Sequence, residues 1–160
     1  MTIESMANYA DIIGGIAVIV SLIYVGVQIR RNTKIGLSQT NQAAHESLAN
    51  VSLEVAKNRE LAVFLRKGLT TFEQLTDDEE FQFLLLMVTV FRRFENIFYQ
   101  HKKGLLEDDL WEGYRQSNLI YFFTDGGQAF WKQRQHTFSE NYRDFLESVS
   151  SNEVKSTPVK

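Results

Sequence analysis

The sequence predicts an all-α protein in which an N-terminal transmembrane helix continues into a stalk, followed by a small antiparallel helical bundle. Three observations predict this class. Residues 12–29 form an apolar run with no side chain that is charged at neutral pH. The chain has one proline, Pro158, and nine glycines, which leaves long segments free to form helices. Beyond the run, apolar residues recur at the three- and four-residue spacing of amphipathic helices.

Composition restricts the class of protein before any motif is considered. A chain of 160 residues with 44% hydrophobic and 23% charged residues is long enough for one folded domain. The absence of cysteine excludes disulfides, thiolate metal sites and thiol catalysis. A net charge of −3 provides no general attraction for nucleic acid, so we expect no nucleic-acid partner.

The apolar run at 12–29 is long enough to cross a membrane. Its length of about 18 residues corresponds to roughly 27 Å of helix, against a bilayer core of about 30 Å. A cleavable signal peptide is disfavoured, because acidic residues precede the run and arginines follow it. An interfacial helix would need a charged face, which this segment lacks. A buried helix of a soluble protein is the remaining alternative at this length.

Charged residues at the two ends of the run predict its orientation. Arg30, Arg31 and Lys34 follow it, whereas the preceding flank is acidic. Since positive flanks stay in the cytoplasm, we expect residues 1–11 to lie outside and residues 30–149 to form a cytoplasmic domain. The same basic residues would attract anionic lipid headgroups.

Two small residues on the apolar run match a spacing found where membrane helices contact each other. Ala17 and Ser21 are four residues apart, a spacing that allows two helices to approach closely in lipid. Self-association through this face is one interpretation. The other is that small residues are simply common in membrane helices.

The stalk, residues 30–57, carries a regular stripe. Its members alternate spacings of four and three: Leu37, Asn41, Ala44, Leu48, Val51 and Val55. This heptad pattern is typical of a coiled coil, but a stalk packed against its own domain would show the same stripe.

Two helices are predicted next along the chain. Residues 59–68 form a short helix that we expect Gly68 to end. Thr76 and Glu79 match a capping box and open the strongest helix, at 77–103. One face of that helix is predicted to carry Phe81, Leu84, Leu85, Val88, Phe91, Glu95, Phe98 and Lys102.

The C-terminal part is predicted to contain two further helices. Asp109 and Glu112 offer a cap pattern for a fourth helix, which we expect to end at the Thr-Asp-Gly-Gly turn, residues 124–127. A last helix is predicted over 128–149, and residues 150–160 are expected to form a flexible tail.

The sequence contains few residue patterns that are typical of catalytic or metal-binding sites. The three histidines, His45, His101 and His136, lie far apart, and none has a glutamate three residues earlier. The sequence contains no glycine-rich phosphate loop and no Gly-x-Ser-x-Gly elbow. We therefore expect no metal, no cofactor and no catalytic activity.

One carboxylate stands on the apolar face of the strongest helix. Buried there, Glu95 must be paired or protonated. An ion pair to an arginine of a neighbouring helix is the structural interpretation, and the functional one is a ligand-binding or proton-sensing group. Three arginines are candidate partners: Arg92, Arg115 and Arg134. Asn96 and Tyr99 would extend either network, and we predict these two, with Glu95 and Arg92, to be the buried polar groups.

Two stretches resemble a widespread group of uncharacterised short bacterial single-pass membrane proteins. The first is Ser-Leu-Ile-Tyr-Val-Gly-Val-Gln-Ile-Arg-Arg-Asn-Thr at 21–33. The second is Arg-Phe-Glu-Asn-Ile-Phe-Tyr-Gln at 93–100, followed by Gly-Leu-Leu at 104–106 and Trp111. The similarity covers most of residues 10–145. It implies bacterial origin, the inner membrane and a helical domain, and it singles out Glu95 and Asn96, but it carries no function.

Three functions are consistent with these patterns. The first is a membrane-anchored interaction or scaffold protein that self-associates or binds another membrane protein. The second is an accessory or pore-forming subunit of a channel or transporter, in which Ser21, Tyr24 and Gln28 would face inward. The third is a membrane-tethered sensor that binds a small ligand near Glu95.

Overall fold

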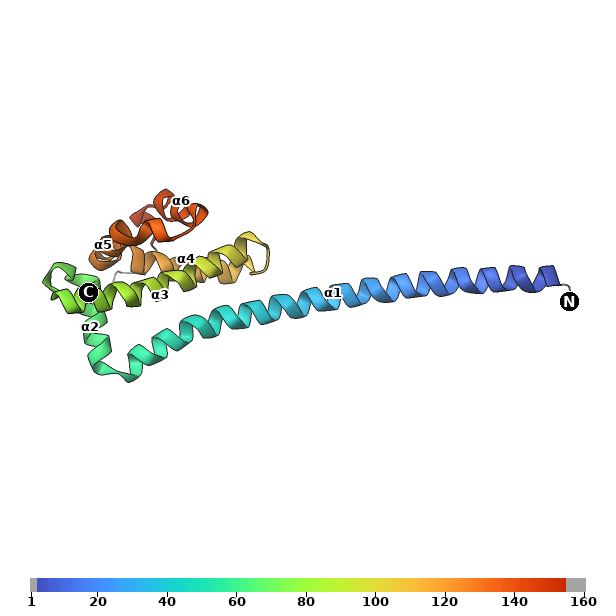
Figure 1. Cartoon of the computed structure of the whole chain (residues 1–160), viewed down its shortest axis with the longest axis horizontal. Helices are drawn as coiled ribbons and strands as arrows, with labels where there is room; N and C mark the ends of the chain where they lie inside the picture. The colour runs from blue at the N-terminus through green and yellow to red at the C-terminus, as the bar shows by residue number, and fades with distance from the viewer. Residues whose placement is uncertain (1–2, 155–160) are drawn as a thin grey trace. The chain divides into compact units, whose positions relative to one another are not determined.

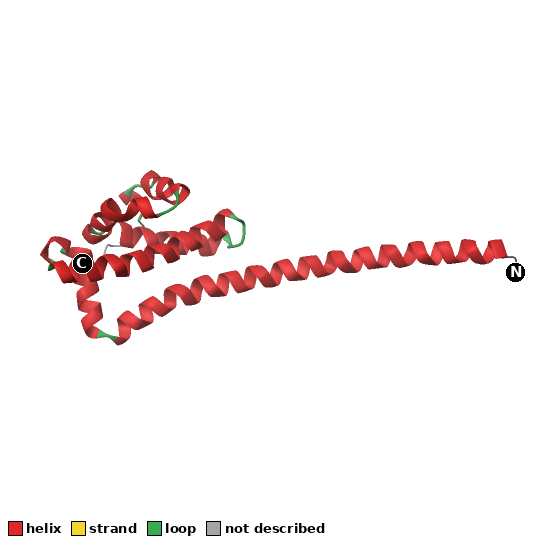
Figure 2. Ribbon diagram, viewed as in Figure 1, coloured by secondary structure: helices red, strands yellow, loops and turns green. Residues whose placement is uncertain are grey.

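The computed structural model describes residues 3–154, with the side chains of 14–33 and 35–154. Every regular element in this part of the chain is helical, which confirms the predicted all-α class (Figures 1 and 2). The α-helices are α1 (Ile3–Lys57), α2 (Arg59–Thr70), α3 (Asp77–Lys102), α4 (Asp108–Phe122), α5 (Asp125–Arg134) and α6 (Glu140–Ser148). Short 3₁₀ turns are η1 (Phe72–Gln74), η2 (Gln135–Thr137) and η3 (Ser151–Glu153).

The chain forms two compact units, Met1–Gln39 and Thr40–Lys160, and the boundary falls within α1. In the first unit every described side chain from 14 to 33 is exposed. Leu22, for example, is 67% exposed. This part of α1 is a helix long and apolar enough to cross a membrane, by length and composition.

The last turns of α1 belong to the second unit, and the predicted stripe is buried there. Ala44 packs with Ile97 and Leu106, while Leu48 and Val51 are half-buried against the main core. These stalk residues therefore pack against the chain's own helical domain, one of the two alternatives that the heptad pattern left open.

α2 does not end at Gly68, as predicted, but continues to Thr70. Gly68 is buried because another helix approaches it closely. A Cβ atom at this position would lie 2.1 Å from Phe83 Cδ2, and one at Gly126 of α5 would lie 2.1 Å from the Gly68 carbonyl oxygen. The two glycines thus let α2, α3 and α5 meet at van der Waals distance.

The predicted capping box at the start of α3 is confirmed. The Glu79 N–H donates to Thr76 Oγ1 at 3.3 Å, and the Thr76 N–H donates to Glu79 Oε2 at 2.8 Å. The Glu79 carboxylate also accepts from Lys67 Nζ of α2 at 2.7 Å, and this hydrogen bond lowers the pKa of Glu79. The cap therefore also fastens α2 to α3.

The predicted apolar face of α3 is only partly correct. Leu84, Phe91 and Phe98 are buried, but Phe81 is 60% exposed and Lys102 lies in solvent. The buried positions are Phe83, Leu84, Met87, Val90, Phe91, Phe94, Ile97 and Phe98. Helices α2, α4, α5 and α6 all contact α3, and α4 runs back along it (Figure 1). A helix surrounded in this way buries a wider face than one stripe.

The start of α4 and the glycine pair at 126–127 differ from prediction. α4 begins at Asp108 after Glu107, whose side chain makes no cap, so the predicted Asp109 cap is wrong. Gly126 and Gly127 do not form a loop, as predicted, but belong to the first helical turn of α5. The Gly127 N–H donates to Thr124 Oγ1 at 3.0 Å, so Thr124 caps that helix.

The predicted last helix, 128–149, is broken into α5, η2 and α6. Phe138, between η2 and α6, has an extended backbone, and its ring is buried in the core. A straight helix through this point could not keep the same ring buried with those of α5.

The segment expected to be a flexible tail begins with an ordered turn. The Ser150 N–H donates to Glu153 Oε1 at 2.9 Å, and the Glu153 carboxylate pairs with Arg115 of α4. The prediction is thus wrong for the η3 turn, while residues 155–160 lie outside the described part of the chain.

Substituting Gly68 by alanine tests the close approach of α2 and α3. We expect Gly68→Ala to lower the free energy of unfolding by about 1–3 kcal/mol, because the added methyl overlaps the Phe83 ring. Tryptophan fluorescence during urea unfolding measures this, since both tryptophans lie in the helical domain.

The matched control is Gly113→Ala in α4, where a Cβ meets nothing within 4 Å. It should raise stability by about 0.5–1 kcal/mol through helix propensity. Equal effects of the two substitutions would contradict the packing role of Gly68.

Candidate functional site

Glu95 is the largely buried carboxylate at the centre of the predicted site. Its side chain is 14% exposed, and both of its oxygens accept a bond. Oε2 pairs with Arg92 Nη1 at 2.6 Å, and Oε1 accepts from the Ser139 N–H at 2.7 Å. Ser139 is the residue immediately before α6, so the carboxylate holds the start of that helix.

Arg92 completes this arrangement, which we name the Glu95 clamp (Arg92, Glu95, Thr137, Phe138 and Ser139). Arg92 Nη2 donates to the Thr137 carbonyl oxygen at 2.5 Å. The guanidinium also lies 4.5 Å from the centre of the Phe138 ring, a cation–π contact. The two side chains thus bind the backbone of the α5–α6 bend at Thr137 and at Ser139, the residues before and after the buried Phe138.

The predicted ion pair exists, but its geometry differs from the expectation. The arginine comes from α3 itself, and the neighbouring segment contributes a backbone N–H. Arg115, another predicted candidate, pairs with Glu112 at 3.5 Å and with Glu153. The sequence identified the buried charge and one of its two partners.

Asn96, Tyr99 and Arg92 were predicted to be buried polar groups and are exposed instead. Asn96 Oδ1 accepts from Gln100 Nε2 at 2.9 Å. Tyr99 is 54% exposed, and Lys103 Nζ lies 5.4 Å from its ring centre. Asn96 and Tyr99 take no part in the Glu95 clamp, so they do not extend its network.

A second buried polar pair was missed by the sequence analysis. Asn118 Nδ2 of α4 donates to the Tyr142 hydroxyl of α6 at 2.7 Å, and Asn118 is 2% exposed. Burial raises the pKa of Tyr142, so the phenol stays neutral. One signal was available: Asn118 lies seven residues after Trp111, four after Tyr114 and four before Phe122, a spacing that places it on the apolar face of α4.

Two of the three histidines, His45 and His101, make contacts that are unrelated to each other. His45 Nδ1 lies 3.2 Å from the Tyr114 hydroxyl. His101 stacks on Trp111 at 4.7 Å, and its Nε2 lies 3.1 Å from Asp108 Oδ1. Among the described residues no group of three or more His, Cys, Asp or Glu side chains could hold a metal ion.

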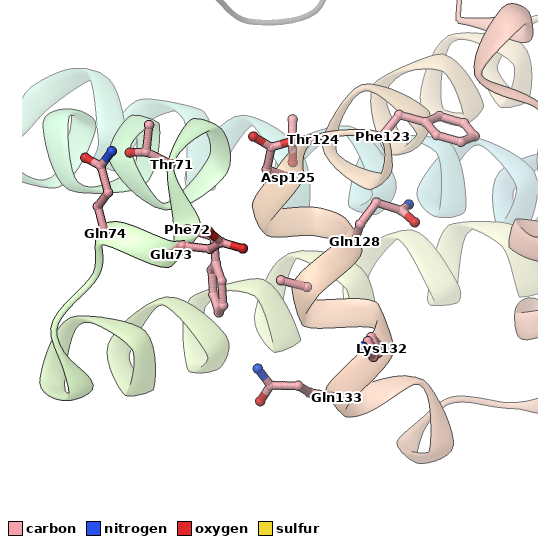
Figure 3. A pocket seen from close by; sticks show the side chains of 11 residues that line it. Thr71, Phe72, Glu73, Gln74, Phe123, Thr124, Asp125, Gln128, Lys132 and Gln133 are labelled. Carbon is pink, nitrogen blue, oxygen red and sulfur yellow. The ribbon is translucent and has the colours of Figure 1, made fainter.

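One groove of the helical domain has a volume of about 910 Å³ and is open to solvent. Figure 3 shows side chains of η1 on one wall and side chains of α5 on the other. Charges of both signs line it, with Glu73 and Asp125 against Lys132. Because both signs of charge are present, the groove does not favour a ligand of one particular charge.

The residues predicted for the membrane segment and its flank lie in the first unit. Arg30 and Arg31 of the basic flank are exposed, and the side chain of Lys34 lies outside the described part of the structure. In the predicted helix-contact pair, the Ser21 hydroxyl donates to the Ala17 carbonyl oxygen at 2.8 Å, within the same helix. Gln28 Nε2 donates to the Tyr24 hydroxyl at 2.8 Å, so two polar groups of the apolar segment bond locally.

No protein-family model, curated protein or solved structure matches this chain. The resemblance to short bacterial single-pass membrane proteins therefore stays a prediction.

The Glu95 clamp can be tested by two substitutions. Glu95→Ala removes both bonds and should lower the free energy of unfolding by about 2–3 kcal/mol. Glu95→Gln keeps an acceptor for the Ser139 N–H and should cost about half as much. Glu54→Gln, on the exposed face of α1, serves as control and should change stability by less than about 0.5 kcal/mol. Unchanged stability in Glu95→Ala would remove the structural role.

Proposed function

We propose that this chain is a single-pass, membrane-anchored helical interaction or scaffold protein of a bacterial inner membrane. The observation that carries the proposal is the exposure of every apolar side chain from Ile16 to Ile29. In water such a surface would be far larger than the apolar patches that monomeric soluble proteins tolerate. In a bilayer the same side chains contact lipid and the helix satisfies its own backbone.

The helical domain is proposed to face the cytoplasm. Arg30, Arg31 and Lys34 immediately follow the apolar segment, and positive flanks remain on the cytoplasmic side. Exposed guanidinium groups at this position also suit anionic headgroups.

A second copy of the chain is the proposed partner within the membrane. Ala17 and Ser21 lie on one face, and the Ser21 hydroxyl is turned back onto the Ala17 carbonyl. That bond keeps the side chain close to the helix surface, which favours a close helix–helix contact.

Two features favour a scaffold over the pore and sensor alternatives. Gln28 bonds Tyr24 within α1, so neither polar group needs a water-filled pore. Glu95 uses both carboxylate oxygens on Arg92 and Ser139, which favours a structural over a ligand-binding carboxylate.

Fractionation tests the anchor. We expect the full chain to remain in membranes after a sodium carbonate wash and to elute as a discrete oligomer in mild detergent. Leu22→Lys should weaken retention, because a charge at the helix centre costs about 2.5–3.5 kcal/mol on insertion. Ser38→Lys, outside the apolar segment, should have no effect. Release of the unmodified chain by carbonate would overturn the anchor.

Single cysteines test the orientation, since the chain has none of its own. In intact spheroplasts a membrane-impermeant maleimide should label Thr2→Cys. It should label Ser151→Cys only after lysis. The reverse pattern would place the helical domain outside the cell and contradict the orientation drawn from the basic flank.

A further inference from the structure

One face of α3 carries apolar side chains that the helical domain leaves uncovered. Phe81 is 60% exposed and Leu85 is 54% exposed, although the opposite face of the same helix is buried in the core. A cleft of about 310 Å³ opens to solvent beside them. It is lined by Phe81, Leu84, Leu85, Val88, Arg92, Arg134 and Thr137. We name the apolar residues that α3 contributes to it, Phe81, Leu84, Leu85 and Val88, the α3 patch.

Charges of opposite sign lie at equal distances on the two sides of Leu85. Asp78 precedes Leu85 by seven residues, and Arg92 follows it by seven. Asp77 and Arg93 stand one residue further out on each side. Seven residues make about two helical turns, so Asp78, Leu85 and Arg92 lie along one line of α3. This line therefore begins with an acid, ends with a base and has an apolar centre.

The charges on this line are available to a partner. Asp77 and Asp78 are exposed, and they form no ion pair with any residue that the structure describes. The side chain of Arg92 is 47% exposed, and the Glu95 clamp uses one N–H of each terminal nitrogen, so its other N–H groups can still donate. Arg134, which lines the same cleft, adds a positive charge that likewise has no described ion pair.

A second copy of α3 matches this pattern when it lies antiparallel with Leu85 at the two-fold axis. Such an axis places each residue opposite the residue that lies equally far on the other side of Leu85. Asp78 of each copy then meets Arg92 of the other, and Asp77 meets Arg93. The two acidic ends are thus each paired with a basic end, and no like charges lie opposite each other.

The same arrangement gives the exposed Phe81 ring a place to pack. Between paired helices, a side chain inserts into the hole formed by four residues of the facing helix. For Phe81 of one copy, the four residues of the other are Leu85, Val88, Thr89 and Arg92. Three of these, all except Thr89, line the cleft, so part of the space for the ring is already open.

Charge disfavours two other ways of covering the α3 patch. A parallel pair would place Asp78 against Asp78 and Arg92 against Arg92, and like charges repel. An anionic membrane surface would be repelled by the first turn of α3, which consists of Asp77, Asp78, Glu79 and Glu80. The antiparallel pair alone brings both ends of the patch against opposite charge.

We propose that the α3 patch binds the α3 patch of a second copy of this chain, in an antiparallel pair with Leu85 at the two-fold axis. This contact lies in the helical domain and is separate from the one proposed at Ala17 and Ser21. The patch is small for two free monomers, but copies that are confined to one membrane meet at a raised effective concentration. To that extent the inference rests on the proposed membrane anchor.

Disulfide crosslinking of the full chain in native membranes tests the pairing, because the chain has no cysteine of its own. Leu85→Cys should form a dimer on mild oxidation, since the two copies of residue 85 meet at the axis. Tyr99→Cys is the matched control, because Tyr99 is also 54% exposed and follows Leu85 on the same line of α3. In the antiparallel pair its two copies lie about 42 Å apart, so no disulfide should form.

A second substitution in the Leu85→Cys chain tests the packing of the ring. Phe81→Ala should lower the yield of crosslinked dimer roughly tenfold, because both copies lose a ring that the pairing buries. Val63→Ala, which shortens a 50% exposed side chain of α2, should leave the yield unchanged.

Charge reversal in the same Leu85→Cys chain tests the ion pairs. Asp78→Arg should lower the yield of crosslinked dimer roughly fivefold, since it places two positive charges together at each end of the pair. Asp109→Arg is the matched control, because Asp109 is the second residue of α4 as Asp78 is of α3 and is also exposed. It removes the same favourable charge from a helix N-terminus and should leave the yield unchanged.

Four results would overturn the proposal. Equal crosslinking at positions 85 and 99 would indicate a parallel pair or random collision. A yield that Asp78→Arg leaves unchanged would contradict the ion pairs. A disulfide from position 85 to a different protein would show that another partner covers the α3 patch. Absence of the position-85 dimer from membranes that retain the chain after a carbonate wash would remove the α3 contact and leave the anchor intact, so the two proposals can fail separately.

Discussion

The helical domain depends on the burial of α3. At its centre the Phe91 ring lies 4.9 Å from Phe130, 5.8 Å from Trp131 and 6.3 Å from Phe138. Aromatic rings bury about 150–250 Å² each and prefer tilted contacts, so this cluster supplies much of the apolar area of the core. Because three of its rings come from α5 and the bend after it, the C-terminal helices must converge on α3. The bend between α5 and α6 allows the rings on both sides of it to pack against α3.

Local signals in the sequence sufficed for the class and for several boundaries. The capping box at Thr76 depends on residues three apart and was predicted correctly. The rotation of α3 could not be predicted, because residues 81–91 carry one polar amide and one hydroxyl among apolar side chains. Such a segment has no polar face to mark its exposed side. Gly68 was misread for a related reason: a glycine that ends a helix and one that admits a neighbouring ring look alike in one sequence.

The candidate site shows the same division between local and tertiary information. A carboxylate among apolar neighbours implies a partner, and Glu95 has one. Its second partner, the Ser139 N–H, is exposed by the bend after η2, which contains neither glycine nor proline. Burial of Phe138 favours that bend, and no local sequence pattern predicts that this ring is buried. The Asn118–Tyr142 bond likewise requires two helices to be placed before either residue has a partner.

The last turns of α1 are held on the helical domain by apolar and polar contacts. Leu48 and Val51 are half-buried against the core, and Ala44 packs with Ile97 and Leu106. Arg93 donates a hydrogen bond to the Ser47 carbonyl oxygen and so ties the same turns to α3. The heptad stripe alone could not separate this packing from a coiled coil, because both bury one residue of every three or four. The contacts from α3 decide between them, since they require the domain to be folded before the stripe has a partner.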